Sequence, residues 1–521
     1  MYAVGRLGAK GKNRLNGYLP SLATARGLIN FLTELFGKLL SSPTVLGQIT
    51  QCRVEAGSTG SKRPGNRTSR RLRAMRAAPP ERVSLMKTKK TRLLNASLIL
   101  VLLLLVASAC HQRRTPTDES KTQNKQGVWI SQPPDDCPFT SSNDIRGIAF
   151  TGRYKVYSMA EADTWFTSWA SDGNLYAQFA DGKVNDIAVG SVLEAGKKTI
   201  TTGYAKLMGD DPMALQVISI GSHASSPLPY LGRYPTANLI HDGVWYYGTY
   251  SLEDVSGFCG NWCTEGPFVG FFISRDFGQT WNDPNLTPSR SLFGESGLNG
   301  SKVKIGSPHF IDFGKNMEHS PDGKAYLVAH GATRPEAHES WISGDAIYLA
   351  RVTPTPENIN DASKYEFFAG YGETGWVDNG WPKWSKKLSD IQPLFDWPDH
   401  TGCVTITYDA PLNKYLMCVT HGWPTVGVFD TYILEADPGS IVGHKGRPNS
   451  TVPWKLVTYM RKFGEQAYFV HIPSKFISSD GRTAWLCYSN DFTGAVAHNM
   501  PPGGLCFAEI KLLLGESPHK P

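Results

Sequence analysis

The chain has 521 residues, of which 40% are hydrophobic and 19% charged, with 52 Gly, 34 Pro, 14 Trp, 21 Tyr and 23 Phe. So many aromatic residues exclude an intrinsically disordered chain, and so many Gly and Pro residues exclude a coiled coil or another long-helix protein. The net charge of +7 does not indicate a nucleic-acid-binding domain, because the first 85 residues carry 15 Lys and Arg against three Glu, and the rest of the chain is mildly acidic.

The first feature along the chain is a basic stretch followed by an apolar run of about a dozen residues, between Lys87 and Cys110. This order is typical of a secretory signal peptide, and the run is shorter than the roughly 20 residues of a membrane span. Because a signal peptide begins a protein, we predict that residues 86–109 are the signal peptide. Residues 1–85 are then an over-extended translation start and are expected to be disordered.

The small residues just before Cys110 resemble a bacterial lipobox, which predicts that Cys110 is the lipidated first residue of the mature protein. The polar, Pro-containing stretch over 110–138 is typical of a tether. An uncleaved signal anchor is the alternative. We therefore expect a bacterial protein that is secreted or held in the cell envelope, at the outer membrane or cell surface. Its contact with the membrane would be made only through the signal or the lipid anchor.

From Phe139 onward, short runs of aromatic and β-branched residues alternate with polar turns, which indicates β-strands. One unit of two strands around a polar turn recurs five times, and Asp-Gly, a favoured hairpin turn, marks most copies. The markers are Asp172, Asp242, Asp322, Asp409 and Asp480, spaced 70–87 residues apart. This repeat predicts an all-β, five-bladed β-propeller over 139–515, followed by a short tail over 516–521. A β-sandwich with coincidental turns is the alternative.

The segment from Ser274 to Trp281, Ser-Arg-Asp-Phe-Gly-Gln-Thr-Trp, matches the Asp-box of sialidases and other propeller glycosidases. The first predicted blade runs from Asp163-Thr-Trp through Asp172-Gly to Asp181-Gly. With these motifs the chain resembles the five-bladed propeller glycosidases of the arabinanase and furanosidase-like superfamily, and also an exported propeller family of environmental bacteria. The resemblance implies a protein that acts on carbohydrate.

In a propeller the inner strand of each blade runs along the axis and the second strand returns. The start of the first strand and the end of the second therefore meet on one face, around a central pit. The predicted inner strands start with Asp163, Tyr234, Thr236, His309, Asp399, His400, Glu465 and Tyr468. The predicted second strands end with Asp181, Tyr250, His330, His421, Asn490 and Asp491. This set is rich in carboxylates, His and Tyr and contains no Lys, which indicates a functional face.

Carboxylates across an axial pit are what glycoside hydrolysis requires, with one acid of raised pKa and one ionised base or nucleophile. The resemblance implies three acids at inner-strand starts. By position we expect Asp163 to be the base, Asp399 to modulate the acid and Glu465 to be the general acid. The residues expected to bind substrate are Asp181, Tyr234, His309, His330, Arg334, His400, His421 and Asp491.

The four histidines His309, His330, His400 and His421 leave other functions open. Imidazoles that converge on the axis could hold a divalent cation, although the sequence identifies no metal or other cofactor with certainty. A His or Tyr base, with Arg334 clamping a uronate carboxylate, would instead make a polysaccharide lyase. A non-catalytic glycan-binding propeller is the third hypothesis. In each case the expected partner is a polysaccharide or oligosaccharide rather than a nucleic acid, and the protein is expected to be a monomer.

The tryptophans and cysteines of the chain support two further predictions. Five tryptophans are candidates for stacking on sugar rings, namely Trp165, Trp169, Trp376, Trp381 and Trp423. Three cysteine pairs are candidates for disulfides, with buried free thiols as the alternative, namely Cys259 with Cys263, Cys403 with Cys418, and Cys487 with Cys506.

Overall fold

The computed structural model describes residues 127–129, 131–253, 264–372, 381–423, 429–440, 453–463, 467–490 and 504–515. Within these residues every regular element is a β-strand or a single-turn 3₁₀ helix. The 3₁₀ helices are η2 (Leu298–Gly300), η3 (Lys315–Met317), η4 (Ala362–Lys364), η5 (Leu388–Asp390), η6 (Pro438–Ser440) and η8 (Ser474–Phe476). No helix in the described part of the chain is long and apolar enough to span a membrane.

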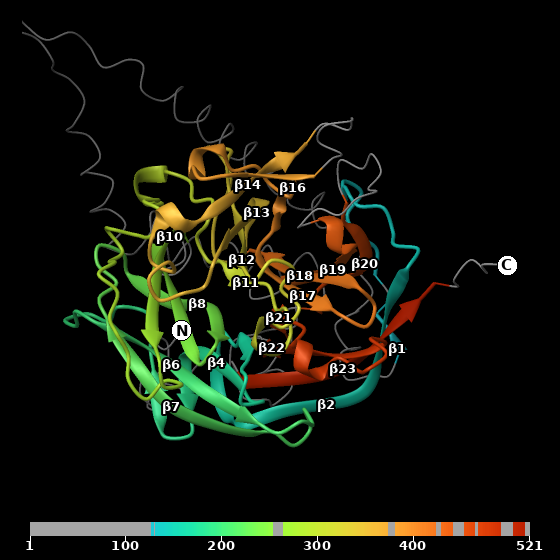
Figure 1. Cartoon of the computed structure of the whole chain (residues 1–521), viewed down its shortest axis with the longest axis horizontal. Helices are drawn as coiled ribbons and strands as arrows, with labels where there is room; N and C mark the ends of the chain where they lie inside the picture. The colour runs from blue at the N-terminus through green and yellow to red at the C-terminus, as the bar shows by residue number, and fades with distance from the viewer. Residues whose placement is uncertain are drawn as a thin grey trace, which may run out of the picture. The chain divides into compact units, whose positions relative to one another are not determined.

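The strands form five antiparallel blades around a common centre (Figure 1). Blade 1 consists of β3 (Thr167–Trp169), β4 (Leu175–Val184), β6 (Ile200–Met208) and β7 (Gln216–Ser225), with β5 (Ile187–Val189) beside β4. Blade 2 consists of β8 (Gly232–His241), β9 (Val244–Glu253) and β10 (Thr264–Ser274). Blade 3 consists of β11 (His309–Phe310), β12 (Ala325–Gly331), β13 (Gly344–Val352), β14 (Glu366–Tyr371) and β15 (Pro382–Ser385), with β16 (Phe395–Thr401) beside β13.

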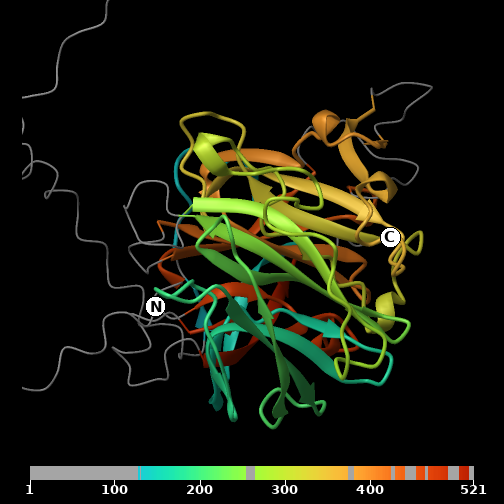
Figure 2. The same ribbon diagram turned by 90° about the vertical axis from the view of Figure 1, so that its left-hand side faces the viewer.

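The last two blades complete the circle. Blade 4 consists of β17 (Cys403–Asp409), β18 (Lys414–Gly422), β19 (Phe429–Ala436) and β20 (Lys455–Met460). Blade 5 consists of β21 (Tyr468–His471), β22 (Thr483–Ser489), β23 (Gly504–Leu514) and the first part of β2 (Ile145–Asp163), with β1 (Gly127–Val128) outside it. The predicted all-β, five-bladed propeller is confirmed. Figure 2 shows the same strands from the side.

The inner strands of neighbouring blades are joined by hydrogen bonds all the way round. From blade 1 onward these are Asn238 Nδ2 to the Phe166 carbonyl (2.8 Å), Ala237 N to the Pro308 carbonyl (2.7 Å), Asp312 N to the Ile406 carbonyl (2.9 Å), Thr405 Oγ1 to the Val470 carbonyl (3.1 Å), and Thr167 Oγ1 with His471 Nε2 (3.1 Å). The last bond joins blade 5 to blade 1. The ring is therefore closed by side chains and backbone groups from all five blades.

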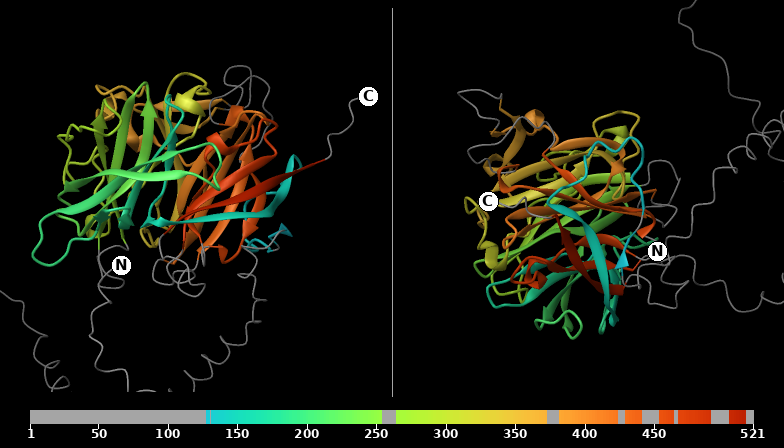
Figure 3. Two further views of the ribbon diagram at one scale, coloured as in Figure 1. Left: turned by 90° about the horizontal axis from the view of Figure 1, so that it is seen from below. Right: turned by 90° about the vertical axis from the view of Figure 1, so that its right-hand side faces the viewer.

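Strand β2 joins the two ends of the propeller. Its first part pairs with β23, with Ile148 opposite Leu512, and its last residue, Asp163, lies opposite Ala180 of β4. Figure 3 shows the cyan β2 beside the red β23. The start of the described chain thus supplies the outer strand of the last blade and then leads directly into the first blade.

The predicted Asp-Gly turns owe their form to local contacts. Asp172 Oδ2 accepts a hydrogen bond from the Tyr176 hydroxyl (2.8 Å), and Asp322 Oδ2 accepts one from the Tyr326 hydroxyl (3.1 Å). Gly173, which follows Asp172, has a φ of 84°, a left-handed conformation that glycine adopts without strain. The same Asp and Tyr, four residues apart, therefore shape two different blades, as a repeat requires.

The candidate disulfides that can be examined are wrong. Cys403, Cys418, Cys487 and Cys506 are buried free thiols. Each pair lies on neighbouring strands, as expected, but not at opposed positions. Cys403 faces Thr420, and Cys487 faces Phe507. Cys259 and Cys263 lie outside the described residues.

Candidate active site

Two carboxylates, Asp163 and Asp181, meet where β2 crosses to blade 1. Asp163 ends β2, rather than beginning the inner strand as predicted, and its backbone lies opposite Ala180, the residue before Asp181. Asp181 has a φ of 42°, in the left-handed region that non-glycine residues seldom occupy. Gly182 is required next, because a Cβ there would lie 2.0 Å from the Glu161 carbonyl oxygen. Strained backbone of this kind is often retained at functional sites.

The two carboxylates have different hydrogen-bond partners. Asp163 Oδ2 accepts a bond from the Tyr468 hydroxyl (3.0 Å), and its Oδ1 accepts one from Thr164 Oγ1 (2.9 Å). Asp181 Oδ1 accepts a bond from the backbone N–H of Ser191 (2.7 Å), and the Tyr234 hydroxyl also bonds to the Asp181 carboxylate. An N–H donor is fixed in place and favours an ionised acceptor.

The pKa values of both acids are raised. Burial is the main cause for Asp163, the negative charge of Asp181 adds to it, and together they raise the pKa of Asp163 to about 8. Burial also raises the pKa of Asp181, while its bonds from Ser191 and Tyr234 oppose the rise. Because two neighbouring carboxylates resist being ionised together, Asp163 retains its proton near neutral pH.

Aromatic side chains from all five blades surround this pair. The buried cluster includes Phe166, Tyr234, Tyr250, Trp341, Phe429, Tyr468 and Phe469. Burial holds the pKa values of the Tyr234 and Tyr250 hydroxyls well above their usual range. These hydroxyls therefore stay protonated and act as hydrogen-bond donors beside the two acids. Tyr234, predicted to lie at the start of an inner strand, is on β8 with its hydroxyl bonded to Asp181, and its role in binding substrate stays a prediction.

A third acid that the sequence interpretation missed, Glu265, lies near the pair. Its Oε2 lies 2.8 Å from His330 Nε2, both side chains are fully buried, and the same His330 nitrogen is 2.8 Å from the Ser340 carbonyl oxygen. Burial alone lowers the pKa of His330, but Glu265 and Ser340 outweigh it and raise that pKa. The charge of Glu265 also contributes to the raised pKa of Tyr250. Glu265 is the second residue of β10, the third strand of blade 2. A third strand starts on the same face as the first, so reading the starts of third strands as well would have found this residue.

Asp399 and Arg334 lie together on the rim of this face. Arg334 donates to Asp345 through Nε (3.0 Å) and Nη2 (2.7 Å), and its Nη2 lies 3.5 Å from Asp399 Oδ1. The Asp399 side chain is 60% exposed. Asp399 belongs to β16, which pairs with β13, whereas the inner strand of blade 4 begins only at Cys403. The structure thus joins Asp399 to Arg334 rather than to the Asp163 pair.

The four predicted histidines occupy three separate surroundings. His309 is buried with its ring centroid 3.7 Å from that of Phe166, and His330 contacts Glu265. His400 stacks on Trp397 at 4.5 Å, and its ring lies 5.1 Å from that of His421. His421 Nε2 lies 3.0 Å from the Tyr459 hydroxyl, and burial lowers the pKa of His421 to about 3. A cation in the axial pit stays a prediction.

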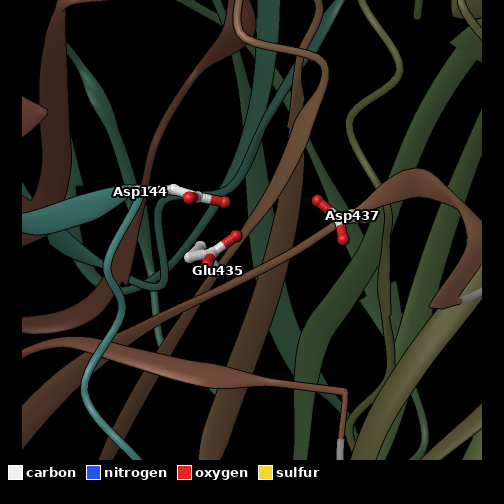
Figure 4. A group of neighbouring side chains, drawn as sticks. All are labelled: Asp144, Glu435 and Asp437. Atoms are coloured by element: carbon white, nitrogen blue, oxygen red, sulfur yellow. The ribbon is translucent and has the colours of Figure 1, made fainter. Parts of the chain in front are cut away.

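Among the described residues, the one group of three potential metal ligands within 4.8 Å of one another is Asp144, Glu435 and Asp437 (Figure 4). It surrounds an ammonium group: Lys414 Nζ lies 2.5 Å from Asp144, 3.1 Å from Glu435 and 2.6 Å from Asp437. Lys414 opens β18 and His421 lies near its end, so the group is at the opposite end of that strand from the predicted functional face. The lysine ammonium therefore already occupies the position that a cation would take among these three carboxylates.

The remaining predicted residues divide into three sets. Trp165 is fully buried, and its Nε1 donates to the Ala162 carbonyl (2.7 Å), so its predicted role in stacking on sugar is wrong. Trp169 is half-buried, and Trp381 and Trp423 are 41% and 40% exposed. Glu465, Asp491, Cys110 and Trp376 lie outside the described residues.

The segment that resembles an Asp-box forms a compact turn. Asp276 Oδ1 accepts from the Thr280 backbone N–H (2.9 Å), and Trp281 Nε1 donates to the Gly278 carbonyl (3.2 Å). Hydrogen bonds from Thr280 and Ser274 hold the pKa of Asp276 low, at about 2. Its carboxylate is thus occupied in shaping the turn at the end of β10, which agrees with a structural role.

No protein-family model matches the chain, and no curated protein matches its sequence. Several solved structures are similar to it. A protein of unknown function from Dyadobacter fermentans has 10% identity and a TM-score of 0.35, over 71% of this chain and 100% of that one. The GH43_1 enzyme from Xanthomonas citri, complexed with xylotriose, has 12% identity and a TM-score of 0.34, over 68% and 88%. The arabinanase of Bacillus subtilis has 12% identity and a TM-score of 0.30, over 69% and 95%. These values are too low to transfer a substrate or a reaction.

Proposed function

We propose that this protein is a carbohydrate-active enzyme, a glycoside hydrolase whose reacting groups are the carboxyls of Asp163 and Asp181. The observation that carries the proposal is the pairing of these two acids on the face where the inner strands begin, among aromatic side chains from all five blades. Glycoside hydrolysis needs one protonated and one ionised carboxyl beside the scissile bond.

The different partners of the two acids suggest their roles. Asp163 holds its proton at neutral pH and would protonate the leaving oxygen as the general acid. Asp181, held by the Ser191 N–H and the Tyr234 hydroxyl, would be the ionised base or nucleophile. This assignment replaces the base role expected of Asp163, because its surroundings favour the protonated form.

The surroundings favour hydrolysis over the lyase alternative. A lyase needs a cation to neutralise the uronate carboxylate, but the Arg334 guanidinium is already paired with Asp345 through two hydrogen bonds. The hydroxyls of Tyr234 and Tyr250 are poor bases, because burial keeps them protonated.

Product analysis tests the proposal. The wild-type protein and its Asp163→Asn and Asp181→Asn variants are incubated with arabinan, xylan, mannan and polygalacturonate, and the products are weighed by mass spectrometry. We expect saturated oligosaccharides from the wild type and a loss of at least about 100-fold in rate in either variant. The control is Asp135→Asn, an exposed residue before β2, which should keep wild-type activity. Products lighter by one water would contradict hydrolysis, and full activity in Asp181→Asn would exclude its role.

We also propose that the enzyme is exported and anchored through Cys110. The support is the signal-like segment before that residue. In a bacterial host supplied with labelled palmitate, the wild-type protein should carry the label and Cys110→Ala should not. Retention of an unlabelled wild-type protein in the cytosol would overturn this proposal and leave the hydrolase proposal standing.

A further inference from the structure

On the face that carries the acid pair lies an aromatic platform made of His338 and Trp423. Their rings stack with centroids 4.0 Å apart and planes inclined by 24°. His338 follows β12, and Trp423 directly follows β18. β12 is the second strand of blade 3 and β18 is the second strand of blade 4. Both strands end on the face where Asp163 and Asp181 lie. The Trp423 side chain keeps 40% of its surface exposed although the imidazole is packed against it.

The connection between β12 and β13, which carries His338, also carries a residue that packs near the acids. Trp341, in the same connection as His338, lies 6.1 Å from the ring of Tyr468. The Tyr468 hydroxyl donates to Asp163. One connection thus supplies both a ring of the platform and a ring that packs on the partner of Asp163, so a glycan bound at the acids can extend over the platform.

Among the residues that the structure describes, the charges around the platform are negative or already paired. Arg334 is bound by Asp345, and Asp399 and Glu336 lie 3.5 Å and 3.8 Å from its nitrogens. The other nearby cation, Lys302, donates to the Ala337 carbonyl. Burial and Lys302 lower the pKa of His338, so that its ring is uncharged at neutral pH. Three carboxylates around one guanidinium repel an anionic sugar but accept hydrogen bonds from sugar hydroxyls.

We propose that His338 and Trp423 form a subsite that stacks on an uncharged sugar ring, with Asp399 receiving its hydroxyls, so that the substrate is a neutral polysaccharide. This inference rests on the proposed function, since it extends the same bound glycan. Stacking places the apolar face of a sugar on the apolar indole. Because the imidazole holds Trp423 in place, little side-chain freedom is lost on binding.

The first experiment measures binding without turnover. Asp181→Asn protein, with and without Trp423→Ala, is run through native gels that contain arabinan, xylan, mannan or polygalacturonate. We expect retardation by at least one neutral polymer, about tenfold weaker without Trp423, and none by polygalacturonate. Trp423→Phe should keep most of the binding, which separates a lost ring from a misfolded protein. Trp381→Ala removes an equally exposed tryptophan that directly precedes β15, the outermost strand of blade 3. Because that strand is the furthest of its blade from the inner strands, we no longer expect Trp381 to stack on the bound sugar, and this variant is the matched control that should bind like the parent protein.

The second experiment separates this inference from the proposed function. On the neutral polymer, Trp423→Ala should raise KM about tenfold and leave kcat unchanged. Retardation by polygalacturonate alone, or equal retardation with and without Trp423, would overturn the subsite. Hydrolysis with an unchanged KM in Trp423→Ala would also overturn it while the hydrolase stands. Trp423-dependent binding in a protein that hydrolyses no polymer would support the subsite and refute the hydrolase.

Discussion

At the scale of single residues, two identical side chains acquire different chemistry from their neighbours. Asp163 is contacted by hydroxyl groups and lies beside a second negative charge, whereas Asp181 receives a backbone N–H. The same burial raises both pKa values, but only Asp181 has a fixed donor that stabilises its charge. A division into acid and base therefore needs no difference in residue type.

The raised pKa of Asp163 predicts a pH-dependent cost to stability. Below its ordinary value of 3.8 the group is protonated in both the folded and unfolded states. Between 3.8 and about 8 the folded state keeps a proton that the unfolded state releases, so this contribution to stability is lost as pH rises. The Asn side chain of Asp163→Asn does not titrate in this pH range, so the variant lacks this loss of stability. We expect the variant and the wild type to be equally stable near the bottom of this window, and the variant to become the more stable as pH rises.

Urea denaturation across this pH range measures the effect, with Asp135→Asn as a control that should follow the wild type at every pH. An Asp163→Asn protein that is less stable than the wild type at the upper end of the window would contradict the burial of a protonated acid. Gained stability together with lost hydrolysis would be the usual sign of a strained functional group.

At the scale of elements, Lys414 joins three parts of the chain. Its ammonium group contacts Asp144 just before β2, Glu435 of β19, and Asp437 after that strand. Glu435 is 1% exposed, so its charge depends on this partner. The contact fastens blade 4 to the segment that leads into the outer strand of blade 5.

Lys414→Met should leave three carboxylates facing one another and lower the free energy of unfolding by about 3 kcal/mol. Chemical denaturation measures the loss. Lys511→Met, on an exposed position of β23, is the matched control and should change stability little. Adding Glu435→Gln to Lys414→Met should recover part of the loss, because it removes the buried charge. An unchanged midpoint in Lys414→Met would show that the ion group does not fasten the blades.

At the scale of the described propeller, closure depends on β2. This strand covers β23 of blade 5 and then carries Asp163 into blade 1, so one strand both seals the sheet and positions a reacting group. Trp129, before it, is 4% exposed and packs on Phe463 at 5.4 Å. The fold and the site therefore share a single element.

A chain that begins at Ser158 should fail to form a stable propeller, because it exposes the apolar edge of β23. A chain that begins at Pro116 retains β1 and β2 and should melt cooperatively. Size-exclusion chromatography and thermal melting followed by circular dichroism compare the two. If the Ser158 chain were monomeric and melted at the same temperature, closure by β2 would not be needed.

The features that could be predicted from the sequence are those that depend on contacts between residues close together in the chain. The Asp-Gly turns, such as Asp172-Gly173, depend on contacts within four residues, which is why their repeat predicted five blades and the face on which Asp163, Asp181 and Tyr234 lie. The tertiary structure alone decided what lies beside these residues. Asp399 is held by Arg334 because β16 pairs with β13, and Glu265 meets His330 from another blade. Such contacts join segments far apart in the chain, and no local pattern of residues records their distances or the burial that shifts their pKa values.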